Sequence, residues 1–210
     1  MTPNPSSRAN ILSGGTIRPF EKTTISPEEM QLLSMRAYTG EIVLVQSEEE
    51  LTSAVKVLEH ADVLGFDTET RPSFKKGEFY KVSLVQFALP GKVFLIQIQK
   101  TGLSEELGKV LSNPNIIKAG VAIRDDIKGL QKFRRFHPEG FVDLSILARE
   151  KGIEVESLKK LTALLLGFRI SKTAQTSNWE TPNLSEKQIE YAATDAWACL
   201  GIYRKLMAME

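Results

Sequence analysis

Two acids and a tyrosine–acid pair stand out in this chain because of their spacing. Asp67 and Glu69 end an apolar run that begins at Leu64. Because side chains alternate faces along a strand, these two carboxylates would project to the same side. Tyr191 and Asp195 are four residues apart in a helical pattern, which places them on one face of a helix, a turn apart.

A third acidic segment lies between these two. Gly120 to Ile123 has the pattern of a strand, which runs into a helix at Asp125 and Asp126. Acids gathered at strand ends and on one helix face repel one another unless cations lie among them. Carboxylate oxygens are hard ligands that suit Mg²⁺ or Mn²⁺. The three segments together therefore predict a site for divalent metal ions.

The order of the three motifs resembles the DEDDy group of 3′–5′ exonucleases. The motifs are Asp-Thr-Glu at 67–69, Gly-Val-x-Ile-x-x-Asp at 120–126 and Tyr-x-x-x-Asp at 191–195. Within that group the chain is most similar to the ribonuclease D and Werner-type exonuclease domains, over residues 40 to 210. Two further segments share this similarity, at the family's second strand and at its last helix with the approach to it: residues 81–87 and 178–195.

This resemblance implies a fold, a cofactor and a role for each acid. The fold is α/β and ribonuclease H-like, with a mixed central sheet of about five strands and helices on both faces. A pair of divalent cations, Mg²⁺ or Mn²⁺, would activate the attacking water and stabilise the leaving oxygen of a phosphodiester. By the resemblance, Asp67 bridges both ions, Glu69 and Asp195 complete the site that activates water, and Asp126 serves the second ion.

Tyr191 takes a position that a histidine occupies in the sister DEDDh group. The two histidines of this chain, His60 and His137, do not precede Asp195 by four or five residues, which indicates the tyrosine subclass. A phenol with a pKa near 10 is a poor general base at neutral pH. We therefore expect Tyr191 to orient the attacking water by hydrogen bonding.

Each of these residues also has an ordinary structural interpretation. Asp67 would then be a turn former at a strand end, Tyr191 a core residue and Asp195 a surface acid. Their paired spacings favour the catalytic interpretation. In the middle motif the family's register selects Asp126, which leaves Asp125 to act as the N-cap of the following helix.

Four other residues have two interpretations. Asp143 could be a fifth metal ligand, but an N-cap for the helix after a short strand is favoured. Trp179 and Trp197 could stack on bases, although packing is favoured for both. Cys199 falls in a helical apolar pattern and is expected to be a small core residue rather than a nucleophile.

Bulk properties indicate one soluble domain. The chain has 210 residues, of which 42% are hydrophobic, and a net charge of +1. No apolar run approaches the roughly 18 residues of a membrane span, and the N-terminus lacks a secretory apolar region. A single cysteine excludes an internal disulfide and suits a reducing, cytoplasmic location. We expect a flexible segment over 1–25 and a single exonuclease domain over 26–210.

Two local basic clusters adjoin the acidic motifs, where a phosphate backbone would have to lie. The alternative for each cluster is an ordinary solvated face. The first cluster contains Lys118, Arg124, Lys128, Lys132, Arg134 and Arg135, and the second contains Arg71, Lys75, Lys76 and Lys81.

Local signals also predict the order of the elements. Capping boxes at Ser26, Ser47 and Ser185 predict three helix starts, the first helix running to about Tyr38. A helix over 158–166 is expected to end at Gly167. The expected strands cover 41–46, 63–68, 82–89, 93–98, 116–122 and 141–144, with a hairpin turn at 89–92.

The sequence therefore predicts a metal-dependent 3′–5′ exonuclease that releases 5′-monophosphates from the 3′ end of DNA or RNA. Its direction comes from the family resemblance. A catalytically silent nucleic-acid-binding module on the same fold is the alternative, but no ligand residue is missing. A phosphatase of small molecules is a third interpretation, and the basic clusters count against it. No motif encodes a contact to a 2′-OH, so DNA and RNA stay open as substrates.

Overall fold

The computed structural model describes residues 22–75 and 77–209. Most of the predicted flexible segment 1–25 lies outside these residues. The strands are β1 (Glu41–Val45), β2 (Val63–Thr70), β3 (Val82–Leu89), β4 (Lys92–Ile96), β5 (Ile117–Gly120) and β6 (Phe141–Asp143). They form one mixed sheet in the order β1-β4-β3-β2-β5-β6. Its six strands correspond to the six predicted ranges, one more than the five or so that the family resemblance implied. Within it, β3 is antiparallel to β2 and β4, and the other neighbours are parallel.

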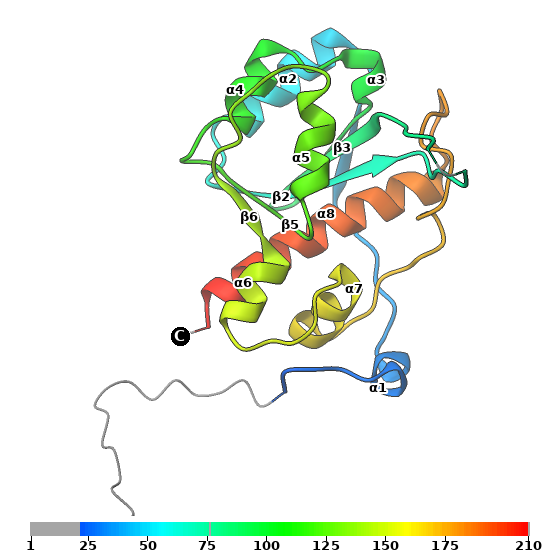
Figure 1. Ribbon diagram of the computed structural model, residues 1–210, viewed down its shortest axis with the longest axis vertical. Coiled ribbons are helices and arrows are strands. Elements are labelled where there is room, and N and C mark those ends of the chain that lie inside the picture. The colour runs from blue at the N-terminus through cyan, green and yellow to red at the C-terminus, as the bar shows by residue number, and fades with distance from the viewer. Residues whose placement is uncertain (1–21, 76, 210) are drawn as a thin grey trace, which may run out of the picture.

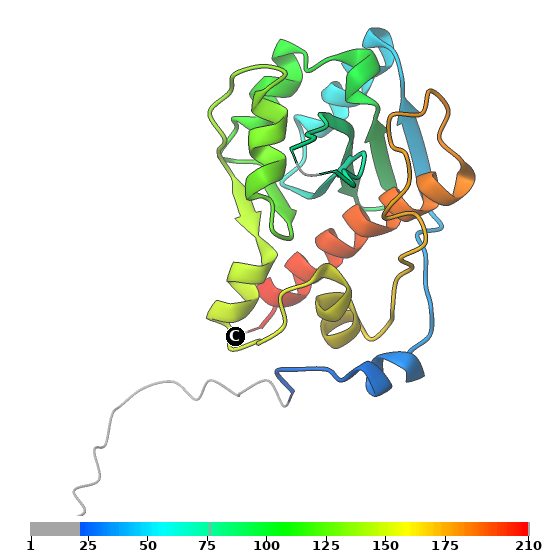
Figure 2. The ribbon, with the colours of Figure 1, turned by 45° about the vertical axis from the view of Figure 1, so that its right-hand side comes forward.

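Helices cover both faces of this sheet (Figure 1). They are α1 (Pro27–Leu32), α2 (Glu48–Leu58), α3 (Ile98–Thr101), α4 (Glu105–Leu111), α5 (Arg124–Gln131), α6 (Leu144–Glu150), α7 (Leu158–Leu161), the π-helical turn η1 (Thr162–Leu166) and α8 (Glu186–Met207). On one face, Phe87 of β3 shares a core with α2, α4 and α5. On the other, Leu84 packs against α8, which crosses the sheet in both ribbon views (Figure 2). None of the helices in the described ranges has the length and hydropathy to cross a bilayer.

Local sequence signals place most helix starts correctly. The side chains of Ser26, Ser47 and Ser185 each accept a hydrogen bond from the backbone amide three residues on. The side chain of that later residue accepts one from the amide of the serine, which completes a capping box. Gly167 ends the predicted helix over 158–166 in a left-handed conformation with φ 74°. The prediction that the first helix extends to about Tyr38 is wrong, because α1 has no buried residue to stabilise further turns.

Small residues let α8 lie directly on the central strand β2. A Cβ added to Gly65 would lie 2.1 Å from the Ala196 carbonyl oxygen and 2.8 Å from the Leu200 nitrogen. Ala192 and Ala193 are fully buried on the same helix face. This close approach brings the side chains of α8 beside the end of β2.

For the four residues that had two interpretations, the structure shows the favoured role, which was packing or capping. Trp179 is 1% exposed and packs against Tyr191 at 6.0 Å between ring centroids, and Trp197 stacks on Phe168 at 5.2 Å. Cys199 is buried. Asp143 caps α6 by accepting a hydrogen bond from the amide of the second residue after it.

Candidate active site

Strand alternation divides the end of β2 between the two faces of the sheet. Phe66 belongs to the core under α2 and α4, and the Thr68 hydroxyl contacts α5 on that same face. Asp67 and Glu69 point the other way, toward α8. There they meet Asp195, and one carboxylate oxygen from each acid lies within 4.8 Å of the other two. The prediction that these three residues come together is confirmed.

Asp126 lies next to this group but not in it. It is in the first turn of α5, where its carboxylate accepts a hydrogen bond from the Thr68 hydroxyl. Burial raises the pKa of Asp126, and the hydrogen bond from Thr68 opposes that shift. Its charge still acts on the neighbouring acids, because it contributes to the raised pKa values of Asp67 and Glu69. The four acids therefore surround the end of one strand from both sides.

Asp125 does not have the structural role that the sequence predicted for it. The N-cap of α5 is Ile123, with no side-chain capping bond. The Asp125 side chain is 90% exposed and pairs with Lys128 at 2.9 Å. Because the helix begins at Arg124, Asp125 lies inside the first turn and faces solvent, where its charge still suits the helix N-terminus. Of the two neighbouring acids, only Asp126 faces the site.

The electrostatics of the acid group call for cations. Burial, followed by the charges of Asp195 and Asp126, holds the pKa of Asp67 well above its usual range. Burial and Asp67 raise the pKa of Glu69 to about 10, and burial raises the pKa of Asp195 to about 7. The buried Oδ1 atom of Asp195 has no hydrogen-bond partner. A largely buried set of hard oxygen donors, with the Asp195 Oδ1 atom unpaired, fits divalent metal ions, which would neutralise the repulsion.

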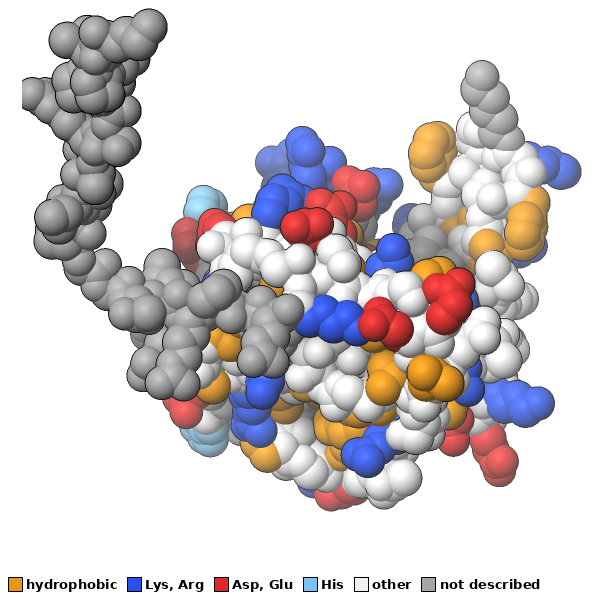
Figure 3. Space-filling view, turned by 90° about the horizontal axis from the view of Figure 1, so that it is seen from below, with side chains coloured by type: hydrophobic (Ala, Val, Ile, Leu, Met, Phe, Trp, Pro, Cys, Tyr) orange, Lys and Arg blue, Asp and Glu red, His pale blue; other side chains and the backbone are white. Residues whose placement is uncertain are grey.

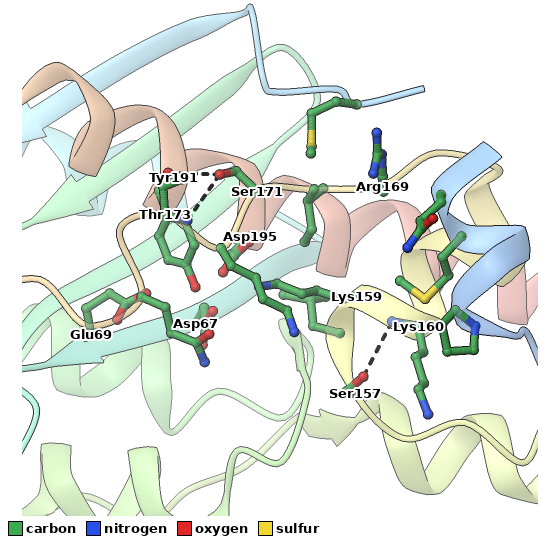
Figure 4. A pocket seen from close by; sticks show the side chains of 18 of the residues that line it. Asp67, Glu69, Ser157, Lys159, Lys160, Arg169, Ser171, Thr173, Tyr191 and Asp195 are labelled. Carbon is green, nitrogen blue, oxygen red and sulfur yellow. Dashed lines mark hydrogen bonds between the residues drawn. The ribbon is translucent and has the colours of Figure 1, made fainter. Parts of the chain in front are cut away.

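Tyr191 lies one helical turn before Asp195 and is 6% exposed. Figure 4 shows its hydroxyl pointing toward the carboxylates. Burial and the charge of Asp195 raise the pKa of this phenol above its usual value. The hydroxyl is therefore a proton donor at neutral pH, suited to holding a water or phosphate oxygen.

The acids lie at one end of a cleft of about 830 Å³. Its other walls are α1, α7 and the loop after η1 (Figure 4). Burial lowers the pKa of Lys159, one of the lining residues, to about 8, and Asp195 opposes that shift. Four basic residues that line the cleft belong to neither predicted basic cluster, although two of them are adjacent at the start of a predicted helix. They are Lys159, Lys160, Arg169 and Lys172.

The two predicted basic clusters contribute less to the site. Lys118 is fully buried, and its ammonium group donates to the carbonyls of Val110 at 3.2 Å and Asn113 at 2.8 Å. Its predicted place in a phosphate-binding cluster is therefore wrong. Arg71 pairs with Glu180 at 3.1 Å. Lys76 of the second cluster lies outside the described residues.

A mixed sheet with helices on both faces and an acidic centre at the end of its central strand defines a ribonuclease H-like nuclease domain. The family model described as 3′–5′ exonuclease matches residues 42–209. The chain belongs to this family of 3′–5′ exonuclease domains, as its motifs predicted. The family uses divalent metal ions, and the acid group offers a place for them.

Individual relatives agree with this assignment. The bifunctional 3′–5′ exonuclease/ATP-dependent helicase WRN of Mus musculus is 37% identical over 155 residues, which are 71% of this chain and 11% of that protein. Ribonuclease D of Gluconacetobacter diazotrophicus is 29% identical over 169 residues, 79% of this chain and 42% of that protein. The crystal structure of the Aedes aegypti Nibbler EXO domain has a TM-score of 0.73 at 26% identity, covering 82% of this chain and 90% of that one. The chain thus spans less than half the length of these two curated relatives.

Proposed function

We propose that this domain is a 3′–5′ exonuclease that hydrolyses the last phosphodiester bond of a polynucleotide and releases a nucleoside 5′-monophosphate. The observation that carries the proposal is the convergence of Asp67, Glu69 and Asp195 within 4.8 Å, at one end of a cleft with basic walls. The family assignment supports both the reaction and its direction.

The acids are proposed to hold two divalent cations, Mg²⁺ or Mn²⁺. The charges of Asp195 on α8 and of Asp126 on α5 both raise the pKa of Asp67, so Asp67 is the acid that would serve both ions. Glu69 and Asp195 would complete one site, and Asp126 the other. When bound, such a pair supplies charge neutralisation and activation of water. Mg²⁺ and Mn²⁺ both accept carboxylate oxygens as ligands.

The protein's own groups then position the reactants. The Tyr191 hydroxyl faces the acids and stays protonated, so it can donate a hydrogen bond that fixes the attacking water or the scissile phosphate. Thr68 holds the Asp126 carboxylate through its hydroxyl. The Tyr191 hydroxyl and the Asp126 carboxylate are therefore in place before the substrate arrives. Such positioning of reacting groups contributes to the rate.

The proposed substrate is the 3′ end of a nucleic acid. One relative is named a ribonuclease and another combines an exonuclease with a helicase, so both RNA and DNA belong in the test. The assay uses single-stranded and recessed-end DNA and RNA, labelled at the 5′ end, with Mg²⁺, Mn²⁺ or EDTA. A descending ladder in metal and none in EDTA is expected. Cleavage that proceeds from the 5′ end, or that persists in EDTA, would contradict the proposal.

A further inference from the structure

The chain before the family match contributes a wall of the active-site cleft. Residues 23–38, here called the N-terminal arm, lie entirely before the matched region, which begins at residue 42. The arm contains α1, which lies beside α7 in both ribbon views (Figures 1 and 2). Side chains of α1 and of α7 line the same cleft as Asp67 and Asp195.

Backbone hydrogen bonds attach the arm to the domain at both ends of α1. The Arg36 amide donates to the Arg169 carbonyl at 2.9 Å, and the Arg169 amide donates to the Ser34 carbonyl at 3.0 Å. Before α1, the Glu154 amide donates to the Thr23 carbonyl at 3.0 Å. Because these bonds use main-chain atoms, the arm keeps its place when side chains in the cleft are changed.

The arm presents apolar side chains to the cleft. Met30 and Met35 line it, and Met35 is 54% exposed. No residue of α1 is buried, so these thioethers do not support a core of their own. Methionine is flexible and polarisable, which suits contact with variable apolar surfaces such as the faces of bases.

The cleft beside the arm also carries positive charge without a partner. The Nε atom of Arg169 and the Nζ atom of Lys159 are buried, and neither has a hydrogen-bond partner. No ion pair within 4.0 Å joins either side chain to a carboxylate in residues 22–75 and 77–209. Buried charge is costly unless an anion compensates it. Figure 4 shows Arg169 well away from the acids, on the side of α1.

We propose that Arg169 and the N-terminal arm form a subsite for the nucleotides upstream of the scissile phosphate in a single-stranded substrate. Arg169 binds a backbone phosphate, and Met30 and Met35 contact the exposed bases. This inference rests on the proposed function. Bases in a single strand expose apolar faces that a duplex conceals by stacking. At about 830 Å³ the cleft is near the upper end of the roughly 300–1,000 Å³ typical of ligand pockets, which leaves room beyond one reacting phosphate.

The test compares a strand with a substrate that has no upstream nucleotide. The strand has about twelve nucleotides, a length within the range that single-strand-binding surfaces cover. The short substrate is the p-nitrophenyl ester of thymidine or uridine 5′-monophosphate. Arg169→Gln should raise KM for the strand about 10-fold or more, as expected for a lost charge-assisted hydrogen bond, with kcat little changed. Hydrolysis of the ester should change far less.

Two further variants complete the comparison. Met30→Ser combined with Met35→Ser should also raise KM for the strand, and because both side chains lie on the surface of the arm, folding should be unaffected. Arg36→Gln is the matched control. It removes a charge from the same arm, but this guanidinium lies over the Phe168 ring, outside the cleft. Its kinetic constants should match those of the unmodified protein.

Equilibrium binding separates failure of the subsite from failure of the proposed function. Binding of the labelled strand is measured by fluorescence anisotropy in Ca²⁺, which also occupies oxygen sites. Weaker binding by Arg169→Gln in a chain that hydrolyses nothing would retain the subsite and remove the exonuclease. Unchanged binding and KM in both cleft variants, or an equal loss on strand and ester, would overturn the subsite.

Discussion

Tyr191 and Asp195 occupy one face of α8, yet burial has different consequences for the protonation of the two groups. Burial raises the pKa of both, to about 7 for Asp195, while the phenol moves further from neutrality. A divalent cation would return the acid to its ionised form. The tyrosine gains no such help and stays protonated. The same helix turn therefore supplies one ligand and one hydrogen-bond donor.

Tyr191→Phe tests this division of roles. Loss of one positioned donor should lower the rate about 10²–10⁴-fold, while metal binding stays unchanged. The pH–rate profile should keep its shape at a lower level, because the ionising group is not the phenol. If the rising limb of the profile disappears in the variant, Tyr191 is a true base and the role given to it here is wrong.

Asp126 and Asp125 are adjacent but make opposite contacts, which provides a matched pair of variants. Asp126→Asn should reduce turnover by about 10²-fold or more with the fold intact, because a carboxylate beside the acid group is lost. Asp125→Asn removes only an exposed pair with Lys128, so turnover and stability should change little. Steady-state kinetics and thermal unfolding of both variants check this. A larger loss in Asp125→Asn would show that the middle motif is assigned one residue out of register.

At the scale of elements, the contact between β2 and α8 assembles the site. Asp67 and Glu69 come from the strand and Asp195 from the helix, so the distance between the two backbones sets the distance between the ligands. Gly65 allows this close approach because the carbonyl of Ala196 occupies the space that a Cβ at this position would need. The packing of α8 and the geometry of the acid group therefore depend on the same glycine.

Gly65→Ala should therefore reduce both stability and activity. The added methyl group would meet backbone atoms at 2.1 Å and 2.8 Å, which cannot rotate away. We expect a loss of about 1–3 kcal/mol in the free energy of unfolding, with a drop in turnover as Asp195 moves. Gly108→Ala in α4 is the control, because its Cβ would have its nearest contact, the Cδ atom of Arg134, at 3.6 Å. Urea unfolding that gives equal stabilities for the two variants would contradict this account of the β2–α8 contact.

Features that depend on neighbours in sequence were predictable, and those that depend on distant partners were not. The partners of the Ser47 capping box are only three positions apart, and the common direction of Asp67 and Glu69 follows from strand alternation. The burial of Lys118 depends on Phe141 of β6, whose ring centroid lies 5.1 Å from the ammonium group, and on how the chain turns between α4 and β5 to offer its carbonyls. The position of Asp126 outside the three-acid group depends on Thr68, which alternation turns to the other face.

The position of the N-terminal arm also depends on a distant partner and could not be predicted from the sequence. Its capping box predicts a helix start at Ser26, but nothing local indicates that the chain will leave the helix after Leu32 and pair with Arg169. That pairing joins segments more than 130 residues apart, and it places methionines in the cleft. The most distinctive wall of the cleft is therefore the part that motif matching could not supply.

Across the whole molecule, charge is balanced and only locally positive. The net charge is +1, and Figure 3 shows Lys and Arg side chains scattered among hydrophobic and acidic ones on the face seen from below. Long-range attraction of a polynucleotide is therefore weak, and recognition depends on the cleft itself. Within the cleft, the charge of the acid group is compensated by cations, whereas the charge of the basic wall is compensated by an anion. A metal-bound phosphodiester supplies both.

This balance predicts how stability depends on pH once metal is removed. In EDTA the folded-state pKa values of Glu69, at about 10, and Asp195, at about 7, lie above those of the unfolded chain. The folded state therefore binds more protons than the unfolded state between about pH 4 and these values, so stability must fall as pH rises through that window. Mn²⁺ or Mg²⁺ binds the ionised folded form, so its stabilising effect should grow over the same range.

Thermal unfolding at about pH 5 and about pH 8, in EDTA and in Mn²⁺, measures both effects. The midpoint in EDTA should decrease toward the higher pH, and the increase caused by Mn²⁺ should be larger there. Asp67→Asn is the control: by removing the acid whose charge raises the pKa of Glu69, it should reduce the pH dependence in EDTA and abolish the metal shift. A midpoint in EDTA that rises with pH, or a full Mn²⁺ shift in Asp67→Asn, would mean that the buried acids do not form the metal centre. The exonuclease proposal would then lose its chemical basis.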